Sequence, residues 1–308
     1  MYTQKGNEGE IALWTSPDRE PDIWIPVNLP MGDLAITLPW VDSSQYDGIL
    51  DELIMNDGIV EGVFRELPES FVPPVPIKAQ LAQLGPLPPF SVFIGKCSDG
   101  LPFLMVLTEP EPGSILITGA DHSGKTSLLK SMLISASELN SPDQVSTRLI
   151  ASRPAEYERI VHYPHCQACV TPYGREASEL IIKLSTIVDG RRSGRFHGSA
   201  MILAIDDLAA LLRGGVDFET MSHLAWLIKH GPQYQVWTFA AMNTSQVGSL
   251  DPQLMDVFGT RLVGKTNPTR LSNLFPGIPY PREDHSSLSY QFEARLAHEC
   301  IHFSAPSV

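Results

Sequence analysis

The sequence has few cysteines, no long apolar run and no surplus of basic residues. Its four cysteines (Cys97, Cys166, Cys169 and Cys300) are too few and too scattered for a disulfide framework in 308 residues, which favours a reducing cytoplasm. No stretch approaches the ~20 apolar residues that span a bilayer, and the N-terminus lacks the basic and apolar regions of a signal peptide. The formal net charge of −13 argues against a broad nucleic-acid-binding face. We therefore expect a soluble, cytoplasmic chain.

One glycine-rich stretch follows an apolar strand pattern and precedes a helical pattern. Gly119, Gly124, Lys125 and Thr126 fit G-x-x-x-x-G-K-[ST], a spacing that lets backbone N–H groups surround a di- or triphosphate at the start of a helix. Lys125 would reach the β- and γ-phosphates, and Thr126 would ligate Mg²⁺. A purely structural glycine turn is the alternative. The predicted cofactors are ATP and Mg²⁺, and the predicted nucleotide-binding residues are Gly119, Ala120, Asp121, His122, Ser123, Gly124, Lys125, Thr126 and Ser127.

Polar side chains also follow two later strand patterns. The apolar run at residues 201–207 ends in Asp206 and Asp207. At the carboxyl edge of a sheet that also carries the phosphate loop, Asp206 would hold Mg²⁺, and Asp207 would orient or deprotonate the attacking water. An acidic helix N-cap is the alternative for this pair. Asn243 follows a strand at 235–241, where it would sense the γ-phosphate or serve only as a turn residue.

The chain falls into two predicted parts. Residues 1–88 form an accessory α+β segment with short strands at 23–27 and 34–38, a helix at 46–60, and proline-rich linkers near its end. Residues 89–308 alternate apolar runs with helical patterns, which predicts an α/β domain with a mainly parallel sheet. Further strands are expected at 91–94, 103–107, 147–151, 168–170 and within 294–303, and helices at 125–138, 155–161, 175–189 (ending at a Gly190 cap) and 218–229.

A cluster of zinc-type ligands lies between two of these elements. His162, His165, Cys166 and Cys169 fall within eight positions, which is dense enough to suggest a zinc site. However, His165 and Cys166 are adjacent and cannot easily face one ion on an extended segment, and both cysteines suit a buried strand. We therefore favour a structural interpretation.

Arginines offer candidates for completing a nucleotide site in a neighbouring subunit. Arg191, Arg192 and Arg195 follow the long helix, where one could act as an arginine finger on the γ-phosphate. Arg261 and Arg270 are alternatives, and solvated arginines near a helix end are an equally good interpretation. The predicted catalytic residues are Lys125, Asp207, Asn243, Arg192 and Arg261; the predicted metal ligands are Thr126 and Asp206.

Taken in order, these motifs resemble the motor domain of the FtsK/SpoIIIE-type DNA translocases, from about residue 89 to the C-terminus. The similar stretches are 94–100, 148–154, 163–165 with 170–172, 189–192, 205–209, 236–247 and 259–261. Three positions differ from the family pattern. Ser152-Arg153-Pro154 stands where the family has Asp-Pro-Lys, Asp207 replaces its Glu, and Asn243 lies near its Gln.

The resemblance implies a RecA-like core, hexameric rings and ATP-driven movement of double-stranded DNA through a central channel. Related ATPase modules of type VII secretion systems move proteins instead. The shorter side chains of Asp207 and Asn243 imply slow hydrolysis, so a nucleotide-binding assembly module with weak or no turnover is a second hypothesis. We expect a monomer at low concentration, and rings only with nucleotide or a partner.

Overall fold

The computed structural model describes residues 75–111, 113–214, 216–249, 252–266, 290–296 and 299–308. The elements predicted within residues 1–74, and the candidate Arg270, lie outside these ranges. No helix within them is long and apolar enough to cross a membrane.

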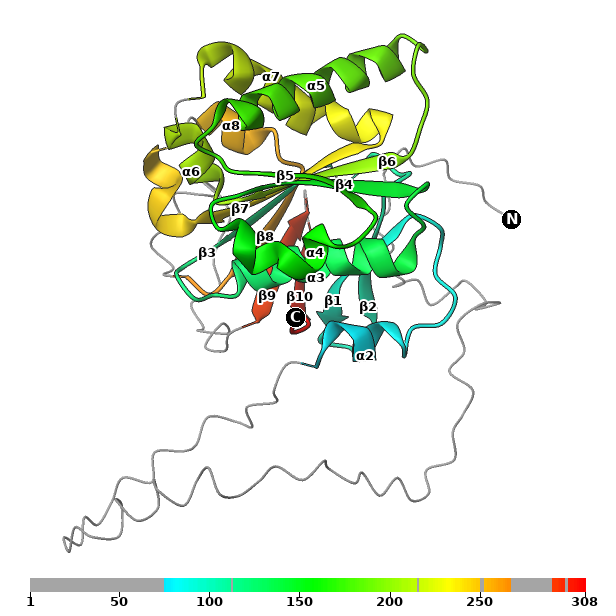
Figure 1. Cartoon of the computed structure of the whole chain (residues 1–308). Helices are drawn as coiled ribbons and strands as arrows, with labels where there is room; N and C mark the ends of the chain where they lie inside the picture. The colour runs from blue at the N-terminus through cyan, green and yellow to red at the C-terminus, as the bar shows by residue number, and fades with distance from the viewer. Residues whose placement is uncertain (1–74, 112, 215, 250–251, 267–289, 297–298) are drawn as a thin grey trace, which may run out of the picture. The chain divides into compact units, whose positions relative to one another are not determined.

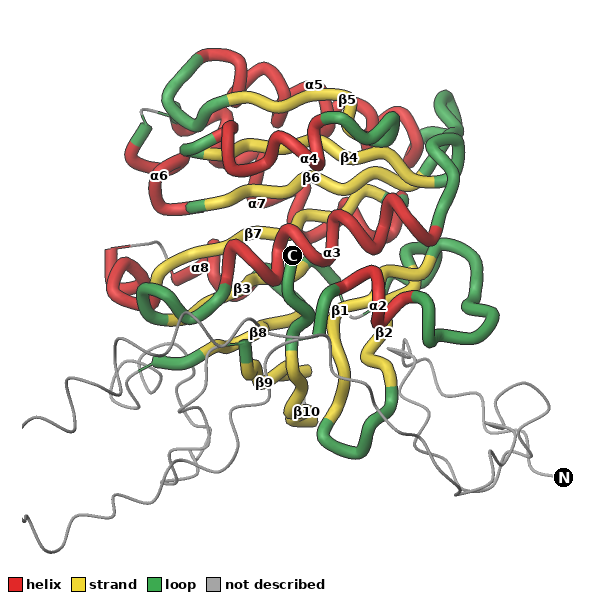
Figure 2. Tube along the Cα trace, turned by 60° about the horizontal axis from the view of Figure 1, so that its bottom comes forward, coloured by secondary structure: helices red, strands yellow, loops and turns green. Residues whose placement is uncertain are grey.

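The ten strands of the described ranges form one sheet in the order β2-β1-β10-β9-β8-β3-β7-β6-β4-β5 (Figures 1 and 2). Strands β8, β3, β7, β6, β4 and β5 are parallel, and β9, β10, β1 and β2 extend the sheet in antiparallel pairing beyond β8. The predicted α/β class is confirmed. The strand bounds are Ser91–Cys97 (β1), Pro102–Val106 (β2), Ile115–Gly119 (β3), Val145–Ala151 (β4), Cys166–Val170 (β5), Ala200–Asp206 (β6), Val236–Asn243 (β7), Thr260–Gly264 (β8), Gln291–Leu296 (β9) and Glu299–Ser304 (β10).

Helices cover both faces of the sheet. In Figure 1, α2, α3 and α4 lie on one side, and α5, α6, α7 and α8 lie on the other. The helix bounds are Ile77–Leu81 (α2), Lys125–Leu139 (α3), Glu158–Val161 (α4), Arg175–Arg192 (α5), Leu208–Arg213 (α6), Phe218–His230 (α7) and Pro252–Asp256 (α8). The 3₁₀ turns are Pro154–Tyr157 (η2), Gly231–Tyr234 (η3) and Thr244–Ser249 (η4).

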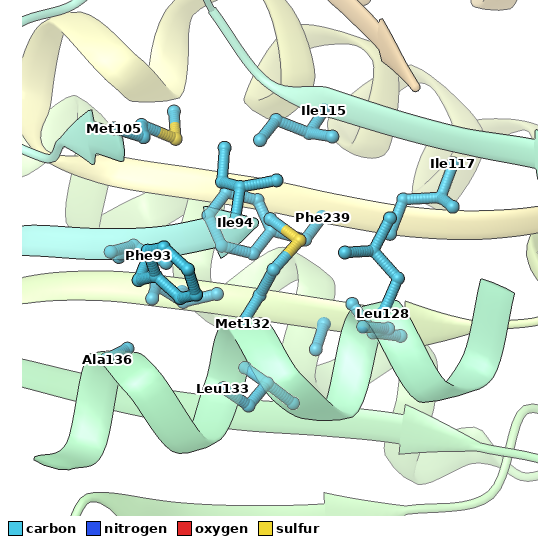
Figure 3. Packing of buried hydrophobic residues seen from close by; sticks show 14 of the residues in the cluster. Phe93, Ile94, Met105, Ile115, Ile117, Leu128, Met132, Leu133, Ala136 and Phe239 are labelled. Carbon is cyan, nitrogen blue, oxygen red and sulfur yellow. The ribbon is translucent and has the colours of Figure 1, made fainter. Parts of the chain in front are cut away.

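Strand β3 lies at the centre of two apolar cores. Its side chains alternate between faces, so Ile115 and Ile117 pack in the core beneath α3 while Leu116 packs in the core beneath α5 and α7. The apolar stripe of α3, formed by Leu128, Leu129, Met132 and Leu133, is fully buried and packs against strand residues such as Phe93 and Phe239 (Figure 3). The phosphate loop is therefore held between a buried strand and a buried helix.

Two predictions about elements are wrong. Helix α5 does not end at Gly190 but continues to Arg192, with Ser193 as its C-cap. Gly190 is needed for space instead, since a Cβ there would lie 1.9 Å from Cδ2 of Phe196. The single strand predicted within 294–303 is an antiparallel hairpin of β9 and β10.

Packing of the sheet begins before residue 89. Ile77 of α2 is 2% exposed and belongs to the core beneath α3, and Pro76 forms a parallel bridge with Ser307. The division of the chain at residue 88 stays a prediction, since the segment 1–74 lies outside the described residues.

Candidate functional site

A cavity of about 620 Å³ opens at the carboxyl edge of the parallel strands. Strands β3, β6 and β7 end together there, because Gly119 pairs with Asn243 and Asp206 pairs with Ala241 in register. The lining residues come from the phosphate loop, the first turns of α3, the ends of β4, β6 and β7, the turns η2 and η4, and the residue before β9; they are Asp121, His122, Gly124, Lys125, Thr126, Ser127, Lys130, Ser152, Arg153, Glu156, Asp206, Asp207, Ala241, Met242, Asn243, Gln246 and Tyr290.

The phosphate loop is a tight turn that requires its glycines. Gly124 has φ 90°, a left-handed conformation that glycine adopts without steric cost. A Cβ at Gly119 would lie 2.3 Å from Ser123 Oγ, so the loop closes over that position. Ala120 and the buried Ser123 form the inner side of the turn, while Asp121 and His122 face the cavity.

Lys125 begins α3 and reaches back over the loop. Its Nζ donates to the Ala120 carbonyl at 2.5 Å and to Ser123 Oγ at 3.4 Å. Burial lowers the pKa of Lys125, and the negative charges of Asp121, Asp206 and Asp207 oppose that shift. The Lys125 ammonium therefore lies near three carboxylates, whose negative charges favour its protonated form.

Thr126 and Asp206 meet at the floor of the cavity. Thr126 Oγ1 donates to Asp206 Oδ1 at 3.1 Å, although eighty positions separate the two residues. Burial raises the pKa of the Asp206 carboxyl, while the nearby hydroxyl of Tyr157 and the hydrogen bond from Thr126 oppose the rise. A hydroxyl and a carboxylate oxygen side by side form the kind of donor set that Mg²⁺ prefers.

Tyr157 was missed by the sequence reasoning. It lies in η2, is 1% exposed, and directs its hydroxyl toward Asp206. Lys130 Nζ sits 5.0 Å from its ring centroid and 3.6 Å from Glu156 Oε2. A tyrosine in a short helical pattern carries no motif, so nothing local in the sequence marks it.

Asp207 combines two roles that the sequence left open. Its backbone has φ 74°, and its Oδ1 accepts the Ala210 N–H at 2.9 Å, so it is the N-cap of α6. It also lines the cavity beside Asp206. The structure therefore shows that Asp207 caps α6, and its role in activating water stays a prediction.

Asn243 likewise both shapes a turn and contacts the loop. Its Oδ1 accepts hydrogen bonds from the backbone N–H and the hydroxyl of Ser245, each at 2.9 Å. Its Nδ2 donates to Asp121 Oδ1 in the phosphate loop. A side chain at the end of β7 is thereby tied to the turn that follows β3.

The predicted arginines lie away from the cavity of their own chain. Arg192 pairs with Asp189 at 2.9 Å near the end of α5, which returns to the amino edge of the sheet before β6 begins. Arg261 is the second residue of β8 and donates to the Met255 carbonyl at 3.0 Å. A contribution of either arginine to a neighbouring subunit stays a prediction.

The zinc-type cluster does not assemble. His165 Nε2 contacts the Asn140 carbonyl at 2.9 Å, and His162 Nδ1 contacts the Glu158 carbonyl at 2.6 Å. Within the described ranges, these histidines and the β5 cysteines do not form a group of metal-ligand distances. The structural interpretation therefore fits their positions.

Three other residues of the cavity lining, Ser152, Arg153 and Tyr290, were not predicted as site residues. Ser152 and Arg153 follow β4, the position of the Ser-Arg-Pro turn, and Arg153 pairs with Glu156 at 2.7 Å. Tyr290 precedes β9 and reaches the phosphate loop, since a Cβ at Gly124 would lie 3.6 Å from Tyr290 Cδ1. A family turn motif indicates the first two residues, and no pattern indicates Tyr290.

Comparison with known proteins supports the resemblance over the stretch that carries the phosphate loop. Residues 90–192 match the model of the FtsK/SpoIIIE family. No curated protein matches the sequence at a significant level. The structure is similar to ATPases 2 and 3 of Thermomonospora curvata EccC bound to a signal sequence peptide, with 16% identity, a TM-score of 0.60 and coverage of 77% of this chain and 44% of that one.

Two further structures share the fold. ATPases 2 and 3 of EssC from Geobacillus thermodenitrificans align with 16% identity and a TM-score of 0.58, over 73% of this chain and 48% of that one. The pCW3 conjugation coupling protein TcpA, in its monomer form with ATPγS, aligns with 17% identity and a TM-score of 0.56, over 72% and 67%. The chain thus spans less than half of the EccC and EssC structures, and these likenesses describe the fold alone. The resemblance inferred from the motifs is confirmed: residues 90–192 match the FtsK/SpoIIIE family model, and the α/β fold is similar to that of the EccC, EssC and TcpA structures.

Proposed function

We propose that this chain binds Mg²⁺ and ATP in the cavity at the carboxyl edge and hydrolyses ATP slowly. One observation carries the proposal: a single cavity joins the phosphate loop, the Thr126–Asp206 pair and the Asn243 side chain. These groups come from the ends of three neighbouring strands, where ligands bind in open α/β sheets.

The residues present fit a nucleoside triphosphate. The loop before α3 offers backbone N–H groups at the positive end of a long helix, and Lys125 supplies a cation beside them. Binding of phosphate would draw Lys125 Nζ from the Ala120 carbonyl toward the anion. The cavity volume of about 620 Å³ accommodates a ligand of nucleotide size.

The residues also fit Mg²⁺. Thr126 Oγ1 and Asp206 Oδ1 lie 3.1 Å apart at the cavity floor and are hard oxygen donors. When bound, the ion would offset negative charge on the phosphates. Thr126 lies in the first turn of α3 and Asp206 ends β6, so the two donors are already side by side in the structure.

Slow turnover follows from how the candidate base is held. Asp207 uses Oδ1 to cap α6, which leaves Oδ2 to orient water or accept its proton. Its side chain is one methylene shorter than the Glu of the family pattern, and the cap restricts its reach. Asn243 is similarly engaged with Asp121 and Ser245.

Phosphate release measured in the wild type and in Lys125→Ala tests the proposal. We expect hydrolysis that depends on Mg²⁺ and falls at least about a hundredfold in Lys125→Ala, because the phosphate-binding cation is lost. Lys183→Ala, a change of an exposed lysine on α5, is the matched control and should leave the rate unchanged. Hydrolysis that persists in Lys125→Ala would contradict the proposal.

A nucleotide-binding assembly module is the second candidate, and the restrained Asp207 favours it. Asp207→Glu separates the two. A sharp rise in turnover would show that the natural site is detuned, whereas rapid turnover in the unmodified chain would exclude a module without hydrolysis. Binding of ATP without turnover in both chains would leave only the assembly module.

What the ATPase moves is a further proposal. The family resemblance implies duplex DNA and a hexameric ring, while the similar structures EccC and EssC and the charge of −13 favour a protein cargo, as in a secretion module. Stimulation of phosphate release by duplex DNA or by a signal peptide distinguishes the two.

Ring formation is tested by light scattering with Mg²⁺ and an ATP analogue. Loss of turnover, but not of nucleotide binding, in Arg192→Ala or Arg261→Ala would identify an arginine that acts between subunits.

A further inference from the structure

The hairpin of β9 and β10 has one face turned toward the core beneath α3 and a second face that carries polar side chains. Phe292, Ala294 and Phe303 pack into the core beneath α3, as expected for alternate positions of a strand. The residues between them point to the opposite face, which the helix layer leaves accessible at β10; they are Glu293, Arg295, Cys300 and His302.

Three of these four side chains bring different metal-ligand atoms together. A carboxylate oxygen of Glu293, Cys300 Sγ and His302 Nε2 all lie within 4.8 Å of one another. Cross-strand pairing produces this arrangement, since His302 lies directly opposite Glu293 and Cys300 lies two residues before His302 on the same face. The Cys300 Sγ to His302 Nε2 distance is 3.9 Å.

We propose that Glu293, Cys300 and His302 bind one Zn²⁺ ion, with water as the fourth ligand. A thiolate, an imidazole and a carboxylate form a donor set that suits Zn²⁺, with bond lengths of about 2.0–2.3 Å. Ligand atoms around such a tetrahedron lie about 3.3–3.7 Å apart, so side-chain rotations of the exposed Cys300 and His302 toward the mostly buried Glu293 carboxylate close the remaining gap.

Arg295 is the local competitor of the ion. Its Nε lies 2.5 Å from Glu293 Oε1, so the carboxylate already has a cationic partner. Glu293 has a second carboxylate oxygen that can bind the ion. Cys300 releases its thiol proton when Zn²⁺ binds, so the ion's two positive charges are balanced by a thiolate and a carboxylate and the added charge is small. Arg295 therefore weakens the site without blocking it.

The ion would clamp the hairpin that joins the parallel and antiparallel strands. β9 pairs with β8 and β10 pairs with β1, so a link between β9 and β10 stabilises the sheet across this junction. The adjoining Tyr290 and Phe292 lie against Gly124 of the phosphate loop. The metal site itself does not depend on the proposed ATPase activity.

Titration of the untagged full chain with Co²⁺, a spectroscopic substitute for Zn²⁺, tests the site. We expect one equivalent to give the visible absorption of a tetrahedral ion and a near-ultraviolet thiolate-to-cobalt band, both removed by Zn²⁺. Cys300→Ser should abolish the thiolate band, and Glu293→Gln and His302→Ala should each weaken binding at least about tenfold. Circular dichroism verifies that each variant is folded.

Cys97→Ser is the matched control, because Cys97 lies on neighbouring β1 opposite Phe303, on the face turned toward the core. It should bind Co²⁺ as the wild type does. Arg295→Ala should bind more tightly, because the competing cation is gone. Absence of the thiolate band in the wild type, or its equal loss in Cys97→Ser, would overturn the proposal.

Discussion

The parallel and antiparallel parts of the sheet place their polar residues by different rules. In the parallel part, the carboxyl ends of β3, β6 and β7 meet at one edge, so residues distant in sequence, such as Thr126 and Asp206, come into contact. In the antiparallel part, strand ends alternate between edges, and polar residues gather on one face through cross-strand pairing, as on β9 and β10. Strand direction therefore determines whether a site forms at an edge or on a face.

The two parts share a single core on the α3 side. Trp237 of β7 is fully buried, and its indole N–H donates to the Leu107 carbonyl just beyond β2 at 3.1 Å. Helix α3 follows the phosphate loop yet packs against β1. If these contacts couple the parts, then the chain should unfold in one transition, and changes at the contacts test that coupling.

Trp237→Ala should have the largest effect. Loss of a fully buried indole leaves a large cavity, and such changes lower the free energy of unfolding by about 3–5 kcal/mol. Urea unfolding followed by far-UV circular dichroism measures it. Trp237→Phe, which keeps a ring but not the bond to Leu107, should cost less. Two separate transitions in the wild type would show that the two parts unfold independently, which would contradict coupling through the shared core.

Ser135→Ala tests the link between α3 and β1. The Ser135 hydroxyl accepts the Phe93 N–H at 3.0 Å and donates to the Phe93 or Met132 carbonyl at 3.0 Å, all in a buried setting. Its removal leaves the Phe93 N–H without a partner, so we expect a loss of about 1–3 kcal/mol in urea unfolding.

Ser131→Ala serves as the control for that change. Its buried hydroxyl donates only to the Leu128 carbonyl within the same helix. Alanine is the better helix former, and no strand amide loses a partner, so stability should change by less than about 0.5 kcal/mol. Equal losses at both serines would contradict a specific bond between α3 and β1.

The sequence predicted most strands of both parts, including β1 and β2, but not β8 or the β9–β10 hairpin. Strong apolar runs and the phosphate-loop spacing mark β3, β6 and β7, because buried parallel strands are apolar on both faces. The β9–β10 hairpin is short and half polar, and its partner β1 lies about two hundred residues earlier, so local periodicity does not specify it. The helix end predicted at Gly190 was wrong for a related reason. The glycine makes room for the ring of Phe196, a contact that the local sequence does not reveal.

The same contrast applies within the site. Contact between Thr126 and Asp206 was predictable, since each follows a strand that ends at the shared edge. Tyr157 and Tyr290 were not, because their positions depend on how η2 and the segment before β9 pack in three dimensions. The sequence did not decide whether Asp207 caps a helix, and the hydrogen bond from the Ala210 N–H in α6 shows that it does.

Asp206→Asn should stabilise the protein while it weakens the site. Burial raises the pKa of Asp206 above the value of 3.8 expected in the unfolded chain, so the folded state binds the proton more tightly. The wild type should lose stability as pH rises from the unfolded pKa through the folded pKa. Above that window, Asn should be more stable by on the order of 1 kcal/mol, and below it the gap should close.

Urea unfolding at several pH values, without metal or nucleotide, measures the gap. Mg²⁺-dependent nucleotide binding measured in parallel should fall in Asp206→Asn, because the amide lacks the charge that attracts the ion. A variant that loses stability at neutral pH would contradict a desolvated carboxylate at this position.

Asp121→Asn should have the smallest effect, and it tests whether this carboxylate weakens nucleotide binding in the cavity at the carboxyl edge of the sheet. Asp121 is an exposed carboxylate within a loop that we propose to bind phosphate, and it accepts a hydrogen bond from Asn243. Asparagine keeps an acceptor oxygen for Asn243 but removes the repulsion between the carboxylate and the phosphates. Because the group is exposed and screened by water, we expect ATP to bind about threefold more tightly at low salt, with the gain reduced at high salt. Calorimetric titration at two ionic strengths measures this, with Asp143→Asn, an exposed change before β4, as the control. Weaker binding by Asp121→Asn at both ionic strengths would mean that the carboxylate assists nucleotide binding and that its repulsion of the phosphates is not its dominant effect.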